Sequence, residues 1–429
     1  MRKLTMEKVV AFSKTYGFIF QGSEIYGGLA NTWDYGPLGV ELKNNVKKLW
    51  WKKFIQEKRS SYGLDASILM NPAVWVASGH VGGFSDPLMD CKECKTRHRS
   101  DNLIETHSNG DITADGWTKE QMLEYINTNN VVCPKCGAHN YTDIREFNLM
   151  FETHRGVTEG NKNEIYLRPE TAQGQFVNFT NVQRSLRAKI PFGIGQVGKA
   201  FRNEITPGNF TFRTIEFEQM EYQMFVKPGT DDEYYLQFKD FAKKLFIDFG
   251  ISEEHLRFHD HDKLAHYAKA ASDIEYLFPL GWGEVNGTHN RTDFDLTQHQ
   301  THSKKAMHYL DPMTNEKYIP YVIESTIGAD RATLMFLCEA YEEETLENGE
   351  TREVLHLHHA LAPYKVSVLP LIKKYHSEKA DELFELVNKH FSSSYDNTGK
   401  IGKRYRRQDV IDIPFGITID NDSLINDNV

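Results

Sequence analysis

The sequence contains no apolar run long enough to cross a membrane, and no internal repeat or low-complexity tract. A membrane-spanning helix needs about 20 consecutive, mostly apolar residues. Residues 1–20 mix Lys, Glu and Ser with short apolar stretches, so they also lack the apolar centre of a secretory signal peptide. These absences exclude a membrane protein and lead us to expect a soluble protein of the cytoplasm.

Cysteine is scarce, and so is any excess of positive charge. The five cysteines are too few for a disulfide scaffold in a chain of 429 residues. The 50 Lys and Arg residues are outnumbered by 60 Asp and Glu residues, which gives a formal net charge of −10. The overall charge therefore argues against a protein that simply coats nucleic acid, although a local basic patch stays compatible with it.

Hydrophobic and aromatic residues, in contrast, are plentiful. Hydrophobic residues make up 40% of the chain, which includes 26 Phe, 20 Tyr and 6 Trp. A disordered or fibrous chain would be poorer in aromatic residues and richer in repeats. The length is about right for two or three folded domains.

The apolar spacing predicts a mixture of helices and strands. We predict helices at residues 4–20, 40–58, 231–248, 332–341 and 377–390, and strands at 67–72, within 164–225, at 281–296, 321–327, 364–370 and 391–429. The strand at 67–72 would end at Pro72, because proline cannot continue a β-ladder. The acidic residues 342–350 are predicted to form an exposed linker or a hairpin. The strand–helix–strand order after residue 364 predicts a small α/β domain with a partly parallel sheet.

Two strand-like runs flank a Pro-Gly turn and predict an antiparallel hairpin. They are residues 199–204 (KAFRNE) and 211–221 (TFRTIEFEQME). Arg202 and Arg213 would lie at the two sides of the loop, and an arginine fork suits phosphate oxygens. Glu204 could accept a hydrogen bond from an exocyclic amine, and Phe217 offers a face for a base. Charged hairpins are also common at surfaces, so the pattern alone is only a weak indication of a nucleotide site.

A second run, residues 323–331 (IESTIGADR), joins an apolar strand to a predicted helix. Gly328 permits a close backbone approach, and Arg331 would lie at the start of the helix, where anions are favoured. Such strand-to-helix turns are ordinary by themselves. Together with the hairpin, however, the run forms a specific combination.

In order and separation, the two runs resemble motifs 2 and 3 of the class II aminoacyl-tRNA synthetases. The helix at 40–58 and the strand closing at Pro72 look like motif 1, the dimer-interface element of that class. Further runs resemble the dimeric glycyl-tRNA synthetase family, from about residue 10 to the end of the chain: residues 26–39 (YGGLANTWDYGPLG), 168–174 (RPETAQG), 281–284 (GWGE), 286–296 and 402–409 (GKRYRRQD).

The resemblance implies an α+β fold, in which an antiparallel sheet flanked by helices forms a class II catalytic core over residues 1–352. A Cys-containing insertion would occupy 88–145, a smaller helical insertion about 227–275, and an α/β anticodon-binding domain 353–429. In this family a further stretch follows, so residues 420–429 would be the middle of a strand pair. The implied activity is glycine–tRNA ligation, in which glycine and ATP form an adenylate and tRNA(Gly) accepts the glycine.

Two alternatives remain open at this point. One is a non-catalytic relative that keeps the fold as an interaction module. The other is a sister class II synthetase for threonine, proline or histidine. The presence of the motif arginines argues against the first, and the acidic residues together with residues 33–37 (WDYGP) argue for glycine.

The resemblance also implies the residues that bind ATP and its Mg²⁺. Arg202 would hold the α-phosphate and the glycine carboxylate, Arg213 and Arg331 would clamp the γ-phosphate, and Phe217 with Arg331 would sandwich the adenine. Glu284, with Glu324 as a second candidate, would serve Mg²⁺ or the ribose region, so that the catalytic set is Arg202, Glu284 and Arg331. The full implied ATP set is Arg202, Asn203, Glu204, Phe212, Arg213, Thr214, Ile215, Glu216, Phe217, Glu284, Val285, Gly328, Ala329, Asp330 and Arg331.

Glycine has no side chain to grip, so a site for it must refuse larger amino acids by filling the space around a Cβ. The implied pocket attracts the ammonium group with Glu170, Glu221 and Glu324. The family has Pro and Ser where this chain has Ser325 and Thr326; Thr326 keeps the hydroxyl and adds bulk. The full implied glycine set is Arg99, Glu170, Phe217, Glu218, Gln219, Met220, Glu221, Glu324, Ser325, Thr326, Ile327 and Gly328.

Four of the five cysteines form two Cys-x-x-Cys pairs, Cys91 with Cys94 and Cys133 with Cys136. Two such pairs can supply a tetrahedral zinc site. The alternatives are free thiols, or a site in which His98 or His139 replaces one cysteine. Cys338 lies on the apolar face of a predicted helix and is expected in the core. Several histidines are expected at the surface without ligand spacing: His259, His261, His299, His302 and His308.

The remaining expectations concern partners. Residues 400–407 contain five basic residues in an otherwise acidic chain, and the resemblance places them in the anticodon-binding domain. The implied tRNA-binding residues are Lys403, Arg404, Tyr405, Arg406 and Arg407. Trp50, Trp51 and Phe54 are too apolar for a free helix face, so we expect a homodimer that covers them.

Overall fold

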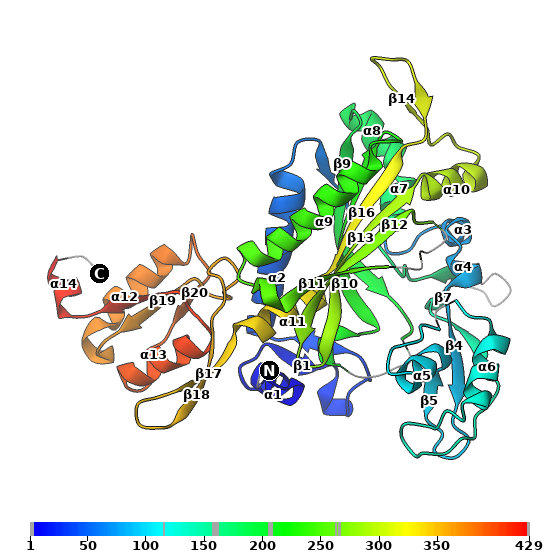
Figure 1. The fold of residues 1–429 in the computed structure, drawn as a ribbon. Coiled ribbons are helices and arrows are strands. Elements are labelled where there is room, and N and C mark those ends of the chain that lie inside the picture. The colour runs from blue at the N-terminus through cyan, green and yellow to red at the C-terminus, as the bar shows by residue number, and fades with distance from the viewer. Residues whose placement is uncertain are drawn as a thin grey trace.

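The computed structural model describes residues 4–114, 116–156, 163–204, 209–261, 264 and 267–426. A large sheet with its helices forms the main body of the molecule, a small lobe is attached on one side, and the C-terminal domain lies at the other end (Figure 1). None of the helices in these ranges is both long and apolar enough to span a bilayer.

The central sheet has seven strands, six of which pair in antiparallel fashion. The seventh strand, β3, runs parallel to its neighbour β9. In spatial order the strands are β11 (Leu256–Asp260), β12 (Ala270–Phe278), β13 (Gly281–Thr292), β16 (Tyr321–Gly328), β10 (Glu216–Val226), β9 (Phe192–Phe201) and β3 (Ser61–Gly63). The strand β16 therefore lies at the centre, between strands that precede it by at least 29 residues in the chain.

Helices cover both faces of this sheet (Figure 1). The larger apolar core lies under α2 (Pro37–Trp51), its π-helical continuation η2 (Lys52–Gln56), α9 (Asp231–Asp248) and α11 (Ala329–Ala340). A second core lies under α7 (Ala172–Val177), α8 (Phe179–Leu186) and α10 (Phe294–Ser303). The predicted helices at 231–248 and 332–341 and the predicted strand at 321–327 are confirmed.

The helix α2 begins at Pro37, which has a suitable φ and no N–H to leave unpaired in the first helical turn. Gly39 allows the helix to approach the preceding segment, because a Cβ at this position would lie 1.8 Å from the carbonyl oxygen of Phe18. Trp50 and Phe54 are fully buried within the same chain. Our expectation that a partner subunit covers them is therefore wrong, since α9 and the central sheet cover them instead.

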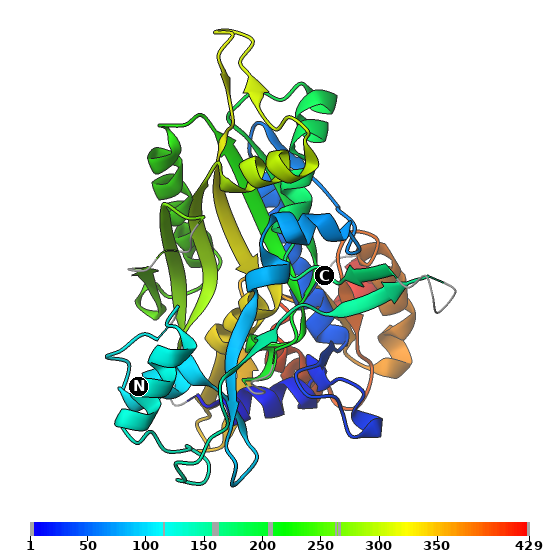
Figure 2. The same ribbon diagram turned by 90° about the vertical axis from the view of Figure 1, so that its right-hand side faces the viewer.

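The small lobe folds around a core of its own, which includes Met89, Leu103, Ile104, Met122 and Ile126. Figure 2 shows it as a separate body below the central sheet. Its elements are β4 (Ser85–Asp90), β5 (Arg97–Arg99), α5 (Ser100–His107), α6 (Lys119–Thr128) and β6 (Arg145–Asn148). The sheet order is β5-β4-β6. The lobe, from Ser85 to Asn148, overlaps residues 88–145, for which an insertion is predicted.

The C-terminal domain has a three-stranded parallel sheet, which confirms the predicted α/β character. Its sheet order is β20-β19-β21, and a hairpin of β17 and β18 precedes it. The elements are β17 (Tyr341–Thr345), β18 (Thr351–Leu355), β19 (Val366–Pro370), α12 (Lys373–Val387), β20 (Ser393–Tyr395), α13 (Ile401–Val410), β21 (Phe415–Ile419) and α14 (Asn421–Asn426). Of the two possibilities for 342–350, the hairpin is thus the correct one.

Shorter elements complete the described chain. The helical ones are α1 (Met6–Thr15), η1 (Glu24–Tyr26), α3 (Pro72–Ala77), α4 (His80–Gly83), η4 (Phe210–Phe212) and η5 (Glu253–His255). The strands are β1 (Ile19–Gln21), β2 (Trp33–Tyr35), β7 (Glu152–Arg155), β8 (Asn163–Tyr166), β14 (Tyr309–Leu310) and β15 (Lys317–Tyr318).

Several local predictions were wrong, and each has a physical reason. Residues 67–72 contain only an isolated bridge at Leu69, because Pro72 begins α3 and Asn71 caps it; the short edge strand is β3. The strand-like region 164–225 also contains α7 and α8. The strand pair predicted at 281–296 is β12 with β13, and α10 begins at Phe294. In the region 391–429 the helices α13 and α14 replace most of the predicted strands, and residues 427–429 lie outside the described ranges.

Candidate active site

A cavity of about 210 Å³ opens over one face of the central sheet, where β10, β16 and β13 run side by side. Most of the residues implied for ATP and glycine line it together: Glu170, Arg202, Glu204, Phe212, Arg213, Thr214, Phe217, Glu218, Gln219, Glu221, Glu284, Val285, Glu324, Thr326, Gly328, Asp330 and Arg331. These residues come from separate parts of the chain, and the sheet register brings them to one place.

The strand register explains which residues of β10 and β16 face the cavity. Glu221 on β10 lies opposite Thr326 on β16, and Gln219 lies opposite Gly328. Because successive side chains of a strand point to opposite faces, Met220 and Ile327 point into the apolar core instead. These two residues were implied for glycine, but the structure places their side chains on the other side of the sheet.

Other implied residues also lie outside the cavity lining. Arg99 forms ion pairs with Asp86 at 3.1 Å and Asp101 at 2.5 Å within the small lobe. Ala329 belongs to the core, and the Ser325 hydroxyl accepts a hydrogen bond from Asn286 at 3.1 Å. The remaining residues outside the lining are Asn203, Ile215 and Glu216, and the last of these pairs with Lys199 at 2.6 Å.

The motif arginines are held by protein groups. The hairpin of β9 and β10 is confirmed, and Arg202 follows the end of β9, where its Nε donates to the Pro169 carbonyl at 3.1 Å. Its guanidinium lies 5.4 Å from the centre of the Phe217 ring. Arg213 lies on the other side of the loop and is 3.7 Å from Glu204. Residues 205–208 of that loop lie outside the described ranges.

Arg331 lies in the first turn of α11 and is fixed by three contacts. Its Nε donates to the Phe212 carbonyl at 2.9 Å, and its Nη1 donates to the Glu284 carbonyl at 3.1 Å and to Glu284 Oε2 at 2.9 Å. The guanidinium also lies over the Phe212 ring at 4.4 Å. Burial would raise the pKa of Glu284, but Arg331 outweighs this effect and the pKa is lowered. Glu284 is therefore ionised, and its side chain is 45% exposed towards the cavity.

Three carboxyl groups approach one another at the inner end of the cavity. Thr171 and Thr326 both donate to Glu221, the latter at 2.9 Å. Burial raises the pKa of Glu221 to about 8, and the nearby charges of Glu324 and Glu170 add to this effect. Glu221 therefore holds a proton at neutral pH in the absence of a further cation.

The other two carboxyl groups are ionised. Burial would raise the pKa of Glu170, but the nearby His80 and Arg291 outweigh it and the pKa is lowered. Burial has the same tendency at Glu324, where Arg291 and a hydrogen bond from His289 at 3.0 Å lower the pKa to about 2. The pocket thus contains two buried carboxylates with countercharges supplied by the protein.

The source of much of this countercharge, Arg291, was not assigned a role from the sequence. It binds Asp295 through two nitrogens, at 2.7 Å and 3.0 Å, and Glu324 at 3.3 Å. Its guanidinium lies over the Tyr267 ring at 4.1 Å. Tyr267, Gly287, His289 and Arg291 all line the cavity. The last three occupy alternate positions on β13, so a two-residue period would have been the signal.

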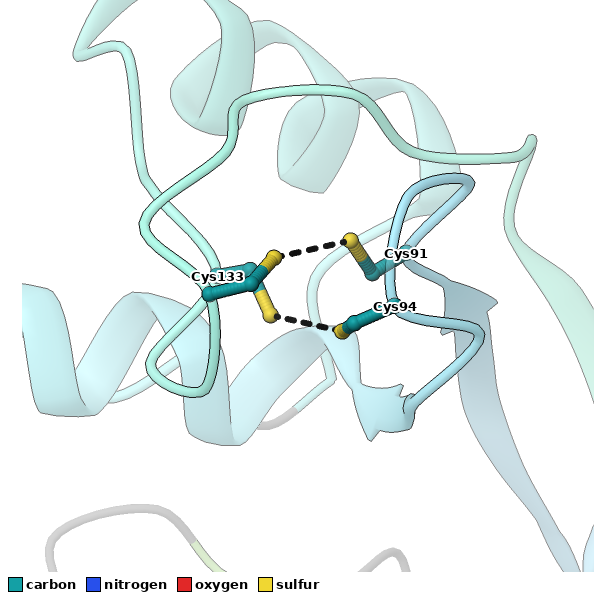
Figure 3. Close-up of side chains that lie close together, drawn as sticks. Cys91, Cys94 and Cys133 are labelled. Atoms are coloured by element: carbon teal, nitrogen blue, oxygen red, sulfur yellow. Dashed lines mark hydrogen bonds between the residues drawn. The ribbon is translucent and has the colours of Figure 1, made fainter.

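The four predicted cysteine ligands form a compact cluster in the small lobe. Their sulfur atoms all lie within 4.8 Å of one another. The sulfurs of Cys91 and Cys136 are 3.6 Å apart and those of Cys94 and Cys133 are 3.7 Å apart, and Figure 3 shows the side chains from the two loops facing each other. Zn–S bonds of about 2.3 Å in a tetrahedron put sulfurs roughly 3.8 Å apart. The cluster therefore has the chemistry and size of a zinc site.

Histidine is close to the cluster but is not needed to complete it. His98 Nε2 lies 3.3 Å from the Cys133 sulfur, whereas His139 Nδ1 lies 2.7 Å from the Val131 carbonyl. Cys338 is fully buried in the core, as predicted. His299 was expected at the surface, but it is buried. Its Nε2 lies 2.8 Å from the Gln173 side-chain oxygen, a partner that makes burial of the ring tolerable.

The basic run of the C-terminal domain lies on α13, and its side chains have different surroundings. Arg404 is buried and donates to the carbonyls of Pro370 and Gly399, so its guanidinium is used inside the domain. Arg407 is 48% exposed and pairs with Asp396 at 2.5 Å. Tyr405 is exposed, Lys403 is exposed, and Arg406 donates to the Glu353 carbonyl at 2.9 Å. Helical spacing therefore divides the run into buried and exposed members.

Two family descriptions match the chain. The description "tRNA synthetase class II core domain (G, H, P, S and T)" matches residues 151–341, and "Anticodon binding domain" matches residues 365–429. The first match contains the cavity strands from β9 to β16, and the second contains the parallel sheet with α12 and α13.

Curated proteins from several bacteria are similar over nearly their whole lengths. The chain is 63% identical to the glycine--tRNA ligase of Clostridium perfringens, over 98% of this chain and 92% of that protein. It is 62% identical to the enzyme of that name from Clostridium kluyveri, over 99% and 93%. For that of Acetivibrio thermocellus the values are 61%, 98% and 92%.

Among solved structures, the chain resembles the prolyl-tRNA synthetase of Giardia lamblia in complex with prolyl-adenylate. The TM-score is 0.62 at 13% identity, and the match covers 98% of this chain and 71% of that one. At this identity the likeness concerns the fold alone, and it agrees with the expected class II architecture.

Proposed function

The chain belongs to the family of the glycine--tRNA ligases, and on that premise we propose that it joins glycine to tRNA(Gly) at the cavity over β10, β16 and β13. The reaction has two steps. Glycine and ATP first form glycyl-adenylate and pyrophosphate, and the glycyl group then passes to the 3′ end of the tRNA. The observation that carries the proposal is the meeting, in one cavity, of the three motif arginines with the three carboxyl groups of Glu170, Glu221 and Glu324.

In the first step, a carboxylate oxygen of glycine attacks the α-phosphorus of ATP, and the bond to pyrophosphate breaks. Little proton transfer is needed, so positioning and cationic stabilisation dominate. Arg202 is at the hairpin end, where it would hold the α-phosphate and the glycine carboxylate. Its neighbour Phe217 offers a face for the adenine.

Arg331 and Arg213 would bind the outer phosphates, with Arg331 packed against the other adenine face. Arg331 is oriented before ATP arrives, because Phe212 and Glu284 fix its guanidinium. Glu284 offers an ionised carboxylate at the cavity, which suits Mg²⁺ as a hard cation. Bound Mg²⁺ would supply positive charge to the phosphate oxygens.

The carboxyl groups at the inner end would hold the glycine ammonium. Glu170 and Glu324 are already ionised, whereas Glu221 has a pKa of about 8 and would lose its proton when the ammonium arrives. Thr326 lies opposite Glu221 and adds a methyl group to the pocket wall. Such a wall would refuse a larger amino acid by occupying the space of its Cβ.

The division of labour follows the domain organisation. We assign catalysis to residues 1–352 and recognition of the anticodon to residues 353–429. Lys403, Tyr405 and Arg407 are exposed on α13, and such cationic and aromatic side chains suit phosphates and unstacked bases. Arg406, on the same helix, is half-buried and donates to the Glu353 carbonyl. Arg404 is buried and supports the domain instead.

Three further properties are part of the proposal. The Cys91, Cys94, Cys133 and Cys136 cluster holds Zn²⁺, which fits its sulfur spacing. The enzyme works in the cytoplasm, where thiols stay reduced. It is a homodimer, and the exposed apolar residues Ile25, Tyr26 and Leu29 are better candidates for the interface than Trp50. Light scattering that gives a stable and active monomer would contradict the dimer.

Pyrophosphate exchange tests the first step without tRNA. Arg202→Ala or Arg331→Ala should lower glycine-dependent ATP–pyrophosphate exchange by at least about 10²-fold, because each removes a charged contact to phosphate. Arg184→Ala is the matched control, since Arg184 is an exposed residue of α8. Near-normal pyrophosphate exchange in both active-site variants would contradict the assignment of Arg202 and Arg331 to phosphate binding.

Salt-dependent tRNA charging tests the C-terminal domain. Arg407→Gln should raise the tRNA KM several-fold and reduce the salt dependence of log KM by about one unit of slope, which corresponds to one phosphate contact. Pyrophosphate exchange should stay at the wild-type rate. Arg404→Gln should instead lower the stability of the domain. Equal losses in charging and exchange for Arg407→Gln would show a structural role.

A further inference from the structure

Asp330 lies in the first turn of α11, directly before the active-site Arg331, and its carboxylate is fully occupied by protein groups. Its Oδ1 accepts from the Tyr35 hydroxyl at 2.8 Å and from Lys43 Nζ at 2.7 Å. Its Oδ2 accepts from the backbone N–H of Glu218 at 2.8 Å. Asp330 was implied as an ATP ligand, but these contacts give it a different task.

Lys43 is the cation of this cluster, and it is nearly inaccessible. Its side chain is 6% exposed, and its Nζ also contacts Glu218 Oε2 at 2.8 Å. The ammonium lies 4.4 Å from the centre of the Tyr35 ring. Burial would lower the pKa of Lys43, but Asp330 and Glu218 outweigh this and the pKa is raised. Lys43 is therefore charged and bridges the buried carboxylate of Asp330 and the half-buried carboxylate of Glu218.

The cluster joins four elements at one point: β2, α2, β10 and α11. Two of them carry groups of the active site, because Phe217 precedes Glu218 on β10 and Arg331 follows Asp330 on α11. The backbone N–H of Glu218 and the Lys43 ammonium both bind Asp330. Lys43 thus fixes the start of α11 against β10, and with it the spacing of the two groups that would enclose adenine.

We propose that Lys43 is a positioning residue for the activation step, which it supports by holding Asp330 and Glu218 and thereby the guanidinium of Arg331. The inference rests on the proposed function. Lys43 does not line the cavity itself. Its effect comes through geometry, where a misplacement of about 1 Å can lower a rate by roughly 10²-fold.

A methionine at this position keeps the length of the side chain and removes the charge. Lys43→Met should lower kcat of glycine-dependent pyrophosphate exchange by about 10- to 100-fold. The KM for glycine should stay within about twofold, because the carboxyl pocket is held by Arg291 and the threonine hydroxyls rather than by Lys43. Lys48→Met is the matched control, since Lys48 is an exposed lysine of the same helix.

The double variant Lys43→Met with Asp330→Asn separates positioning from simple stability. It removes one buried charge of each sign, and Glu218 keeps Lys47 at 3.2 Å as its partner. The midpoint of thermal unfolding should return towards the wild-type value. In contrast, kcat should remain low because the Lys43 ammonium that links α2 to α11 is still missing. This variant also serves if the single variant does not fold.

The outcomes are distinct. A kcat within twofold of wild type in the single variant, or recovery of kcat together with stability in the double variant, would overturn the positioning role. The positioning role would also be overturned if the single variant had a higher KM for every substrate and the spectrum of an unfolded protein, and if the double variant restored both. A wild-type protein without any glycine-dependent exchange would overturn the proposed function and the inference with it.

Discussion

The carboxyl pocket and the cysteine cluster both gather groups that repel one another when ionised, but they balance the charge in different ways. In the pocket, Arg291 and His289 contact Glu324, and Glu221 keeps a proton. In the cluster, four sulfurs meet, and among the described residues the other side chains that hydrogen-bond to them are those of Thr96 and His98. The pocket therefore contains its own countercharge, whereas in the cluster the proposed Zn²⁺ would supply it.

The two sites also differ in how the chain builds them. The sulfurs come from two short loops of one small lobe, and its apolar core is modest. The carboxyl groups come from β10, β16 and the segment before α7, which the large sheet holds in register. Rigid, long-range strand pairing can hold buried carboxyl groups close together, whereas ligands on short loops would gain stability from the proposed metal.

The largest expected effect is on the small lobe, which contains the proposed zinc site. Cys133→Ser should remove most of the bound zinc, because the binding free energy of a structural zinc, about 10–16 kcal/mol, is also folding free energy there. Elemental analysis should show the loss, and hydrogen exchange should show residues 85–148 unprotected while the central sheet stays protected. Cys338→Ala should keep its zinc. If the lobe were fully protected from hydrogen exchange in zinc-free protein, the cluster would not need an added cation and would not differ from the pocket in this respect.

The next effect concerns the internal countercharge of the pocket. Arg291→Met removes the guanidinium that pairs with both Asp295 and Glu324. Removing one member of a buried ion pair lowers the free energy of unfolding by about 3–5 kcal/mol. Urea unfolding should report this loss, with a large rise in the glycine KM. The control is Arg145→Met, an exposed pair with Asp90 that is worth less than about 1 kcal/mol. Equal losses in the two variants would mean that the pocket does not depend on its own cation.

The smallest effect is the proton on Glu221. A raised pKa means that the folded protein binds a proton that the unfolded chain has released, so this group lowers stability as pH rises from about 4.5 to about 8. A cationic ligand favours the ionised form, so the glycine KM should fall as pH rises towards 8. Glu221→Gln should flatten both dependences, while Glu124→Gln, in the small lobe, should leave them unchanged. A glycine KM independent of pH in the wild type would contradict the assignment.

The sequence predicted most of the elements and motifs that depend on local residue patterns. The hairpin around Arg202 and Arg213, the helix α9, the strand β16 with α11, and the Cys-x-x-Cys pairs all follow from spacing within a few residues. The resemblance then assigned most cavity residues. Alternation along β10 and along β16 would also have excluded Met220 and Ile327, respectively, because every second residue of each strand faces the core.

The failures concern contacts between distant segments. Burial of Trp50 and Phe54 depends on α9, which lies far along the chain, so their apolar character could not distinguish a core from an interface. Arg404 resembles its basic neighbours in sequence, yet helical spacing turns it towards the Pro370 carbonyl. Lys43 and Arg291 stabilise carboxylates from other elements, and neither role is visible without the sheet register.

The order of the central strands has a consequence for synthesis on the ribosome. The strand β16 is the last of the seven in the chain, yet it lies between β13 and β10. Until residue 328 has emerged, β9 can pair with β10 and β12 with β13, but β10 and β13 would each present an unpaired edge. Exposed edges of this kind invite pairing with other chains. Because β16 also carries Glu324 and Thr326, the insertion of this one strand would close the sheet and complete the pocket in the same event.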